Sequence, residues 1–204
     1  MSNIQCILYD LDGVLVDACE IHYEAFNKAL MHVCGFKISR REHESTFNGL
    51  PTNTKLEILK KQGRVDDDVF QSVADIKQNC TLAQVATLTV DPTKVDLHQK
   101  TKELGYQLGC VTNCVRHSAE ELLSQTGQYE FMDIVISNED IVHPKPNSEG
   151  YITAMIRLGV EPPNVLIVED SPKGLEAAYA TGAHVLQVAD ATEVTWDNIR
   201  KATR

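Results

Sequence analysis

This sequence lacks a surplus of positive charge. Lys and Arg number 19 against 29 Asp and Glu, so the formal net charge is -10. Proteins that bind nucleic acid or anionic membranes without sequence specificity need a basic surface. We therefore expect no nucleic-acid partner and no membrane partner. An anionic substrate would have to be bound by a local cationic site. The acidic balance favours solubility, and we expect a monomer or a weak dimer.

Paired cysteines and long apolar segments are also missing. None of the six cysteines forms a CxxC pair, and most lie in apolar or helix-like stretches where reduced thiols pack well. The N-terminal residues have neither a basic region nor a long apolar stretch, which predicts no signal peptide and no transmembrane helix. These features favour a reducing compartment, and we expect a cytoplasmic protein.

The order of apolar and polar stretches predicts the fold class. Short apolar runs that end in polar residues indicate buried parallel strands at 4–9, 106–111, 133–136, 165–168 and 184–188. Helical patterns followed by glycine lie at 94–104, 118–126, 148–158 and 173–181. Strands that alternate with helices predict an α/β fold with a doubly wound, Rossmann-like parallel sheet.

One region interrupts this alternation. Residues 18–85 have helical patterns at 21–33, 54–62 and 68–78 but no convincing buried strand. We expect an inserted all-helical cap domain at 18–85 and a Rossmann-like catalytic core formed by 1–17 and 86–204. The aspartate run 66–68 is typical of a helix N-terminus rather than of a metal site.

Two carboxylates follow the first predicted strand, at the end where an open parallel sheet binds ligands. Asp10 and Asp12 precede Gly13, which allows the backbone to turn sharply beside them. A calcium-binding EF-hand loop is disfavoured, because Val14 and Leu15 stand where that loop needs an oxygen ligand and a glycine. Taken alone, the segment also fits a strand end with an Asx turn.

A second acid pair, Glu169 and Asp170, follows the strand at 165–168. Carboxylates beside a buried strand are costly unless a metal ion or another cation compensates them. The sequence therefore predicts a cation next to this pair.

Two further segments offer groups that can bind phosphate. Thr112 and Asn113 end the second strand and can donate hydrogen bonds to a phosphoryl oxygen, although turn chemistry also explains them. Lys145 lies between Pro144 and Pro146, which restrict the path of the chain that presents its ammonium. The alternative is an ordinary solvated loop lysine.

In this order, the four segments resemble the motifs of the haloacid dehalogenase-like hydrolase superfamily. The stretch DLDGVLVD at 10–17 resembles the first motif, Thr112 the second, Lys145 the third, and Glu169 with Asp170 the fourth. Two features resemble the β-phosphoglucomutase-like branch with its helical cap. They are the helical insert directly after the first motif, and the stretches HPKP at 143–146 and VEDSPKG at 168–174. The resemblance spans nearly the whole chain.

The resemblance implies a phosphoryl-transfer mechanism for these residues. Asp10 would attack phosphorus and form an aspartyl-phosphate. Asp12 would protonate the leaving alcohol and later deprotonate the attacking water. Thr112 and Lys145 would stabilise the charge of the transferring phosphoryl group.

The resemblance also implies a Mg2+ cofactor. Its expected ligands are the Asp10 carboxylate, the Asp12 backbone carbonyl and Asp170, with Glu169 as a further ligand or as an anchor behind them.

In the insert, the resemblance implies a substrate-facing role for three residues. His22 matches a histidine that is common in this branch, and Lys77 resembles a cap lysine that can reach the active site, although either fits a surface position as well. Thr52 stands where mutases of this branch tend to place an arginine for a second phosphate. Lys55 or Arg116 are the alternatives for that function.

Three functions follow from these interpretations. The first is a Mg-dependent phosphatase that hydrolyses a small phosphorylated metabolite such as a sugar or polyol phosphate. The second is a β-phosphoglucomutase-like sugar-phosphate mutase, and the third is a non-catalytic binding protein with the same fold. The departure at Thr52 favours the phosphatase.

Overall fold

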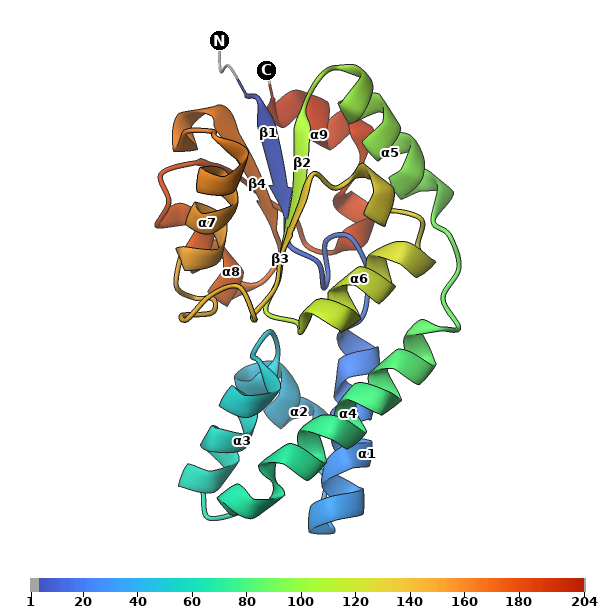
Figure 1. Cartoon of the computed structure of the whole chain (residues 1–204), viewed down its shortest axis with the longest axis vertical. Coiled ribbons are helices and arrows are strands. Elements are labelled where there is room, and N and C mark those ends of the chain that lie inside the picture. The colour runs from blue at the N-terminus through green and yellow to red at the C-terminus, as the bar shows by residue number, and fades with distance from the viewer. Residues whose placement is uncertain (1–3, 204) are drawn as a thin grey trace. The chain divides into compact units, whose positions relative to one another are not determined.

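The computed structural model describes residues 4–203 and divides the chain into two compact units (Figure 1). One unit contains residues 1–17 and 88–204, and the other contains residues 18–87. The sequence predicted an insert that ends at residue 85, two residues before the end of the smaller unit. The assignment of the units as catalytic core and cap remains a prediction.

A five-stranded sheet lies at the centre of the larger unit, and all its neighbouring strands are parallel. The strands are β1 (Cys6–Tyr9), β2 (Gln107–Val111), β3 (Ile134–Ile136), β4 (Val165–Glu169) and β5 (His184–Gln187). Their order is β3-β2-β1-β4-β5. The predicted doubly wound α/β fold is therefore confirmed.

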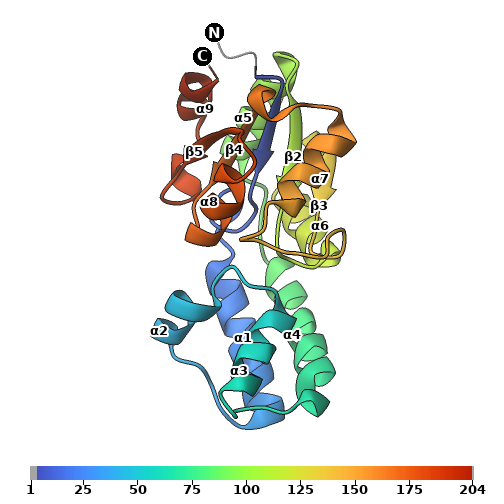
Figure 2. The ribbon, with the colours of Figure 1, turned by 90° about the vertical axis from the view of Figure 1, so that its left-hand side faces the viewer.

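Helices cover both faces of this sheet (Figures 1 and 2). On one face lie α5 (Pro92–Glu103), α6 (Arg116–Gln125) and α9 (Trp196–Ala202), and on the other lie α7 (Glu149–Leu158) and α8 (Pro172–Tyr179). Every residue of β1 and β4 is buried between these layers, which explains why both sequences are apolar runs up to Glu169, the last residue of β4. The helix α9 was not predicted.

The strand order determines where polar residues meet. From β1 the chain continues to β2 and β3 on one side, and then to β4 and β5 on the other. The carboxyl ends of β1 and β4 therefore flank the point where an open sheet binds ligands. Tyr9 pairs with Val168, and the Asp10 amide donates to the Val168 carbonyl at 3.0 Å, so Asp10 and Glu169 leave the sheet side by side.

The smaller unit is helical, as predicted. It contains α1 (Cys19–Cys34), α2 (Arg40–Glu42), α3 (Thr52–Lys61) and α4 (Phe70–Val85), with a π-helical turn at His43–Phe47 and a 3-10 turn at Asp67–Val69. Phe26, Leu30, Phe47, Leu56 and Leu59 form the centre of its own apolar core. Its last helix extends beyond the predicted end at residue 78, and the short helix α2 was not predicted.

Within the described residues, none of the helices combines the length and the apolar character that crossing a bilayer requires.

Candidate active site

An ammonium group joins two carboxylates at the ends of β1 and β4. The Nζ atom of Lys145 lies 2.5 Å from Asp10 Oδ1 and 2.6 Å from Glu169 Oε1. All three side chains are buried. The sequence predicted each residue, and the structure brings Lys145 to Asp10, 135 residues away, and to Glu169, 24 residues away.

Glu169 is surrounded by donors from the protein itself. Its Oε1 accepts hydrogen bonds from Lys145 and from the Tyr151 hydroxyl at 2.8 Å. Its Oε2 accepts from the backbone amides of Asp170 (3.0 Å) and Ser171 (3.2 Å), and from the Ser171 hydroxyl (3.3 Å). The resemblance allowed Glu169 to be a metal ligand or an anchor behind the ligands. Because protein donors contact both of its carboxylate oxygens, the structure favours the anchor.

The buried charges change each other's ionisation. Burial raises the pKa of Asp10 well above its usual range, the charge of Glu169 raises this pKa further, and Lys145 opposes the rise only in part. Burial alone would lower the pKa of Lys145, but the carboxylates of Asp10 and Glu169 hold it well above its usual value. The lysine therefore stays charged, whereas an ionised Asp10 calls for additional positive charge nearby.

The donor set beside Asp10 fits a divalent cation. One carboxylate oxygen from each of Asp10, Glu169 and Asp170 lies within 4.8 Å of the others. Asp170 Oδ1 is buried and has no hydrogen-bond partner among the residues that the structure describes. Burial, followed by the charge of Glu169, raises the pKa of Asp170 to about 6. A hard cation that prefers oxygen ligands, such as Mg2+, would give Asp170 Oδ1 a partner and would stabilise the ionised carboxylates of Asp10 and Asp170.

Two glycines permit the close approach of these carboxylates. Gly13 has φ 88°, and a Cβ atom there would overlap the Asp170 carboxylate. A Cβ atom at Gly174, in the first turn of α8, would overlap the Glu169 carboxylate. The sequence predicted the turn at Gly13. A glycine in the first turn of a helix, where its helix propensity is poor, was the available signal for Gly174.

The segment after β2 supports Lys145 from a different direction. Both polar atoms of the Asn113 amide contact the backbone of Lys145: Nδ2 donates to its carbonyl at 3.2 Å, and Oδ1 accepts from its amide at 3.0 Å. These two hydrogen bonds position the lysine, and the predicted contact of Asn113 with phosphate stays a prediction. The Lys145–Pro146 peptide bond is cis. Thr112 is buried, and its hydroxyl accepts a hydrogen bond from the Cys114 amide at 3.0 Å.

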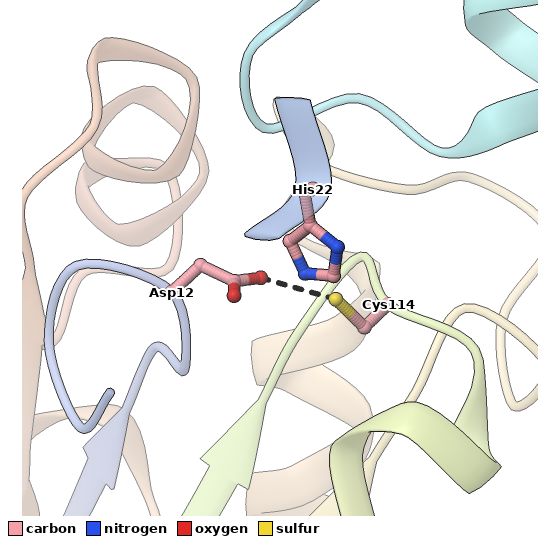
Figure 3. A group of neighbouring side chains, drawn as sticks. All are labelled: Asp12, His22 and Cys114. Carbon is pink, nitrogen blue, oxygen red and sulfur yellow. Dashed lines mark hydrogen bonds between the residues drawn. The ribbon is translucent and has the colours of Figure 1, made fainter. Parts of the chain in front are cut away.

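Asp12 has a partner that the sequence did not reveal. The thiol of Cys114 donates a hydrogen bond to Asp12 Oδ2 at 3.0 Å (Figure 3). Tyr151 was missed in the same way, because an aromatic residue on the apolar face of a predicted helix is read as core. Only the tertiary structure reveals these two contacts. Cys114 lies 102 residues from Asp12, and Tyr151 lies 18 residues from Glu169 on a different element.

The predicted insert residues lie within the smaller unit. Lys77 on α4 places its Nζ 3.3 Å from Nδ1 of His22 on α1. Thr52 is the first residue of α3, and the ammonium of Lys55 lies 5.4 Å from the centre of the Phe26 ring. Their predicted contact with substrate stays a prediction.

Arg116, one alternative for holding a second phosphate, belongs to the larger unit. Its guanidinium contacts Glu120 at 3.2 Å and also forms an ion pair with Asp140. Two acids already neutralise this cation, which weakens that alternative.

Comparisons with known proteins agree with the geometry. The haloacid dehalogenase-like hydrolase family model matches residues 7–188. A validoxylamine A 7'-phosphate phosphatase from Streptomyces hygroscopicus subsp. limoneus is 30% identical, over 94% of this chain and 96% of its own. A pyrophosphatase, PpaX, from Bacillus velezensis is 28% identical, over 92% and 84%. β-Phosphoglucomutase from Clostridium difficile has the same fold, with a TM-score of 0.86 at 21% identity, over 98% of this chain and 97% of that one. Because the family model matches residues 7–188 and so covers most of the chain, this protein belongs to the haloacid dehalogenase-like hydrolase family.

Proposed function

We propose that this protein is a divalent-metal-dependent phosphatase that acts on a small phosphorylated metabolite, such as a sugar or polyol phosphate. The strongest support is the 2.5 Å contact between the Lys145 ammonium and the buried carboxylate of Asp10. Asp10 follows β1, at the point where the strand order reverses direction. The names of its relatives, a phosphatase and a pyrophosphatase, point to the same reaction class.

The reaction would proceed through Asp10. A carboxylate oxygen of Asp10 attacks phosphorus, the bond from phosphorus to the leaving oxygen breaks, and Asp12 donates a proton to that oxygen. Asp12 then takes a proton from water as the water oxygen attacks phosphorus and releases Asp10. A cation such as Mg2+, held by the Asp10 and Asp170 carboxylates and the Asp12 backbone carbonyl, would stabilise the negative charge of phosphate and nucleophile.

Lys145 would stabilise the transferring phosphoryl group, and three residues hold it ready. The ammonium donates to Glu169 at 2.6 Å and lies 4.7 Å from the centre of the Tyr151 ring, and Asn113 holds the backbone. A preorganised cation needs no rearrangement when charge develops, which is how such sites lower a reaction barrier.

Hydrolysis is favoured over a mutase reaction because a mutase must hold a second phosphate. Thr52 stands where the resemblance led us to expect an arginine, and Arg116 is already paired with Glu120 and Asp140.

A phosphate-release screen tests the proposal. Several dozen phosphorylated metabolites and inorganic pyrophosphate are incubated with the protein and Mg2+, and Asp10→Asn, which keeps the shape but loses the nucleophile, serves as the blank. We expect release from one or a few sugar or polyol phosphates, abolished by Asp10→Asn and by chelation. Equal release by Asp10→Asn would reject Asp10 as the nucleophile. If a sugar bisphosphate instead stimulates interconversion of sugar phosphates without release, the mutase is correct.

A further inference from the structure

We infer that Cys114 is a positioning residue for Asp12: its thiol engages Oδ2 of the carboxyl group, so that Oδ1 exchanges the proton with the leaving group and with water. This inference rests on the proposed phosphatase function. It starts from the 3.0 Å contact between Cys114 Sγ and Asp12 Oδ2, which joins the loops after two neighbouring strands, β1 and β2 (Figure 3).

The backbone on the Cys114 side of this contact is fixed. The Cys114 amide donates to the Thr112 hydroxyl at 3.0 Å, and the Cys114 carbonyl accepts from the Asn138 amide at 3.0 Å. The thiol therefore comes from a loop that is itself held by hydrogen bonds.

The backbone on the Asp12 side is equally constrained. Asp12 forms a bridge with Val16, and the Gly13 amide donates to the Val16 carbonyl at 2.8 Å. With both loops in place, the remaining freedom of Asp12 is rotation of its side chain. A hydrogen bond to one carboxyl oxygen restricts that rotation.

The contact has a chemical consequence. A thiol is a weak donor with one hydrogen, and a protonated carboxyl group carries its proton on one of two oxygens. With Oδ2 accepting from the thiol, the proton resides on Oδ1. When the bond between phosphorus and the leaving oxygen breaks, the leaving oxygen keeps the electron pair and takes the Oδ1 proton. Oδ1 later accepts a proton from the attacking water, and the thiol keeps its hydrogen throughout.

This role predicts a dependence on the leaving group. A basic alkoxide needs the proton from Asp12, whereas para-nitrophenolate leaves without it. Loss of the thiol should therefore lower kcat/KM, which reports the transfer to Asp10 and not the later attack of water, for alkyl phosphates and spare kcat/KM for para-nitrophenyl phosphate. A purely structural role for Cys114 would slow both reactions alike.

The experiment compares kcat/KM for para-nitrophenyl phosphate, phenyl phosphate and the alkyl phosphate that the wild-type protein hydrolyses fastest. We expect Cys114→Ala to stay within about twofold of wild type on the nitrophenyl ester and to lose up to roughly tenfold on the alkyl ester, since one ordinary hydrogen bond can change a rate by up to about that factor. Cys114→Ser, which keeps a donor, should recover most of the loss. Cys34→Ala, on α1 of the other unit, removes a thiol elsewhere and should change neither rate.

A double-mutant cycle separates positioning from structure. In Asp12→Asn, which discriminates against the alkyl ester by itself, the added Cys114→Ala change should have no further effect. An equal loss on all three esters, no loss on any, or an undiminished loss in the Asp12→Asn background would overturn the inference. Failure of the wild-type protein to hydrolyse any phosphate ester would instead overturn the proposed function, and with it this inference.

Discussion

Two fully buried tyrosines differ in what their hydroxyl groups contact. Tyr151 donates to Glu169 at 2.8 Å, whereas the hydroxyl of Tyr9 has no hydrogen-bond partner among residues 4–203. We expect Tyr151→Phe to lower the free energy of unfolding by about 1.5–3 kcal/mol, because it removes a donor from a buried charged acceptor. Tyr9→Phe, the matched control, should leave stability unchanged or slightly higher. Urea unfolding measures both, and a larger loss for Tyr9→Phe would contradict the assignment.

At the scale of single residues, a substitution of Asp170 tests whether a cation binds at this carboxylate. Burial and Glu169 raise the pKa of Asp170 to about 6, so its ionised form destabilises the metal-free fold at neutral pH. We therefore expect Asp170→Asn to unfold at the same or a higher temperature than wild type without metal. Added Mg2+ should raise the melting temperature of wild type, by mass action, and leave Asp170→Asn unchanged. An equal rise in both proteins would show that the cation binds elsewhere.

At the scale of elements, α5 is attached to the rest of its unit by a buried lysine. Lys94 Nζ donates to the carbonyls of Ala191 (2.5 Å) and Val194 (2.9 Å), in and after the 3-10 turn Ala191–Glu193. Lys94→Met would leave two carbonyls without this donor and should lower the free energy of unfolding by about 1–3 kcal/mol.

The control for Lys94 lies on the same helix. Lys100 forms an exposed ion pair with Asp96, four residues earlier on the helix, so Lys100→Met should change stability by less than about 0.5 kcal/mol. Similar losses for the two variants, measured by urea unfolding, would contradict the role given to Lys94.

The same helix should make the fold sensitive to acid. His98 is buried and hydrogen-bonded to Gln128 at 2.9 Å, and Gln128 Nε2 donates to the Leu15 carbonyl, in the loop after β1, at 3.1 Å. Burial lowers the pKa of His98 to about 4. The unfolded chain therefore binds a proton that the folded protein does not, and stability should fall as pH drops from about 6.5 towards 4, by at most about 3 kcal/mol.

A substitution isolates the contribution of His98. Glutamine can place an amide N–H near the position of the histidine Nε2 and cannot be protonated in this range. We expect His98→Gln to flatten the pH dependence of urea unfolding between pH 4 and 6.5, with part of the slope remaining because burial also lowers the pKa of His43 to about 4. An unchanged slope would assign the acid sensitivity to other groups.

At the scale of the whole molecule, the two units have separate apolar cores. Cys6, Leu8 and Tyr151 belong to one core, and Phe26 and Leu56 belong to the other. Units with separate cores open independently when few interactions couple them.

Hydrogen exchange tests this independence. Leu56→Ala should reduce the protection of amides in 18–87 by about 2–5 kcal/mol, the usual result of removing a buried leucine side chain, and should leave the amides of β1 and β4 protected. Met31→Ala, at a half-exposed position on α1, is the control and should change little. An equal loss of protection in both units would show that they unfold together.

The extent of sequence prediction differs between elements for physical reasons. Most strands were found because they are short, mainly apolar runs, whereas the edge strand β5, with exposed His184 and Gln187, carries this signal only at its centre. Helices such as α7 were found because a glycine follows them, and Gly159 has φ 70°. The short helices were missed. A segment of three residues such as α2, or of seven such as α9, is too short for hydrophobic periodicity to be read.

The sequence by itself determined the family, the fold class and the order of the acidic, hydroxyl and lysine residues at the strand ends, because these depend on local patterns along the chain. Tertiary structure alone decided which atoms meet. Lys145 bonds Asp10 across 135 residues, and Cys114 bonds Asp12 across 102. Such contacts depend on strand order and backbone geometry, which bring distant side chains to one edge of the sheet, and no local pattern encodes their distance.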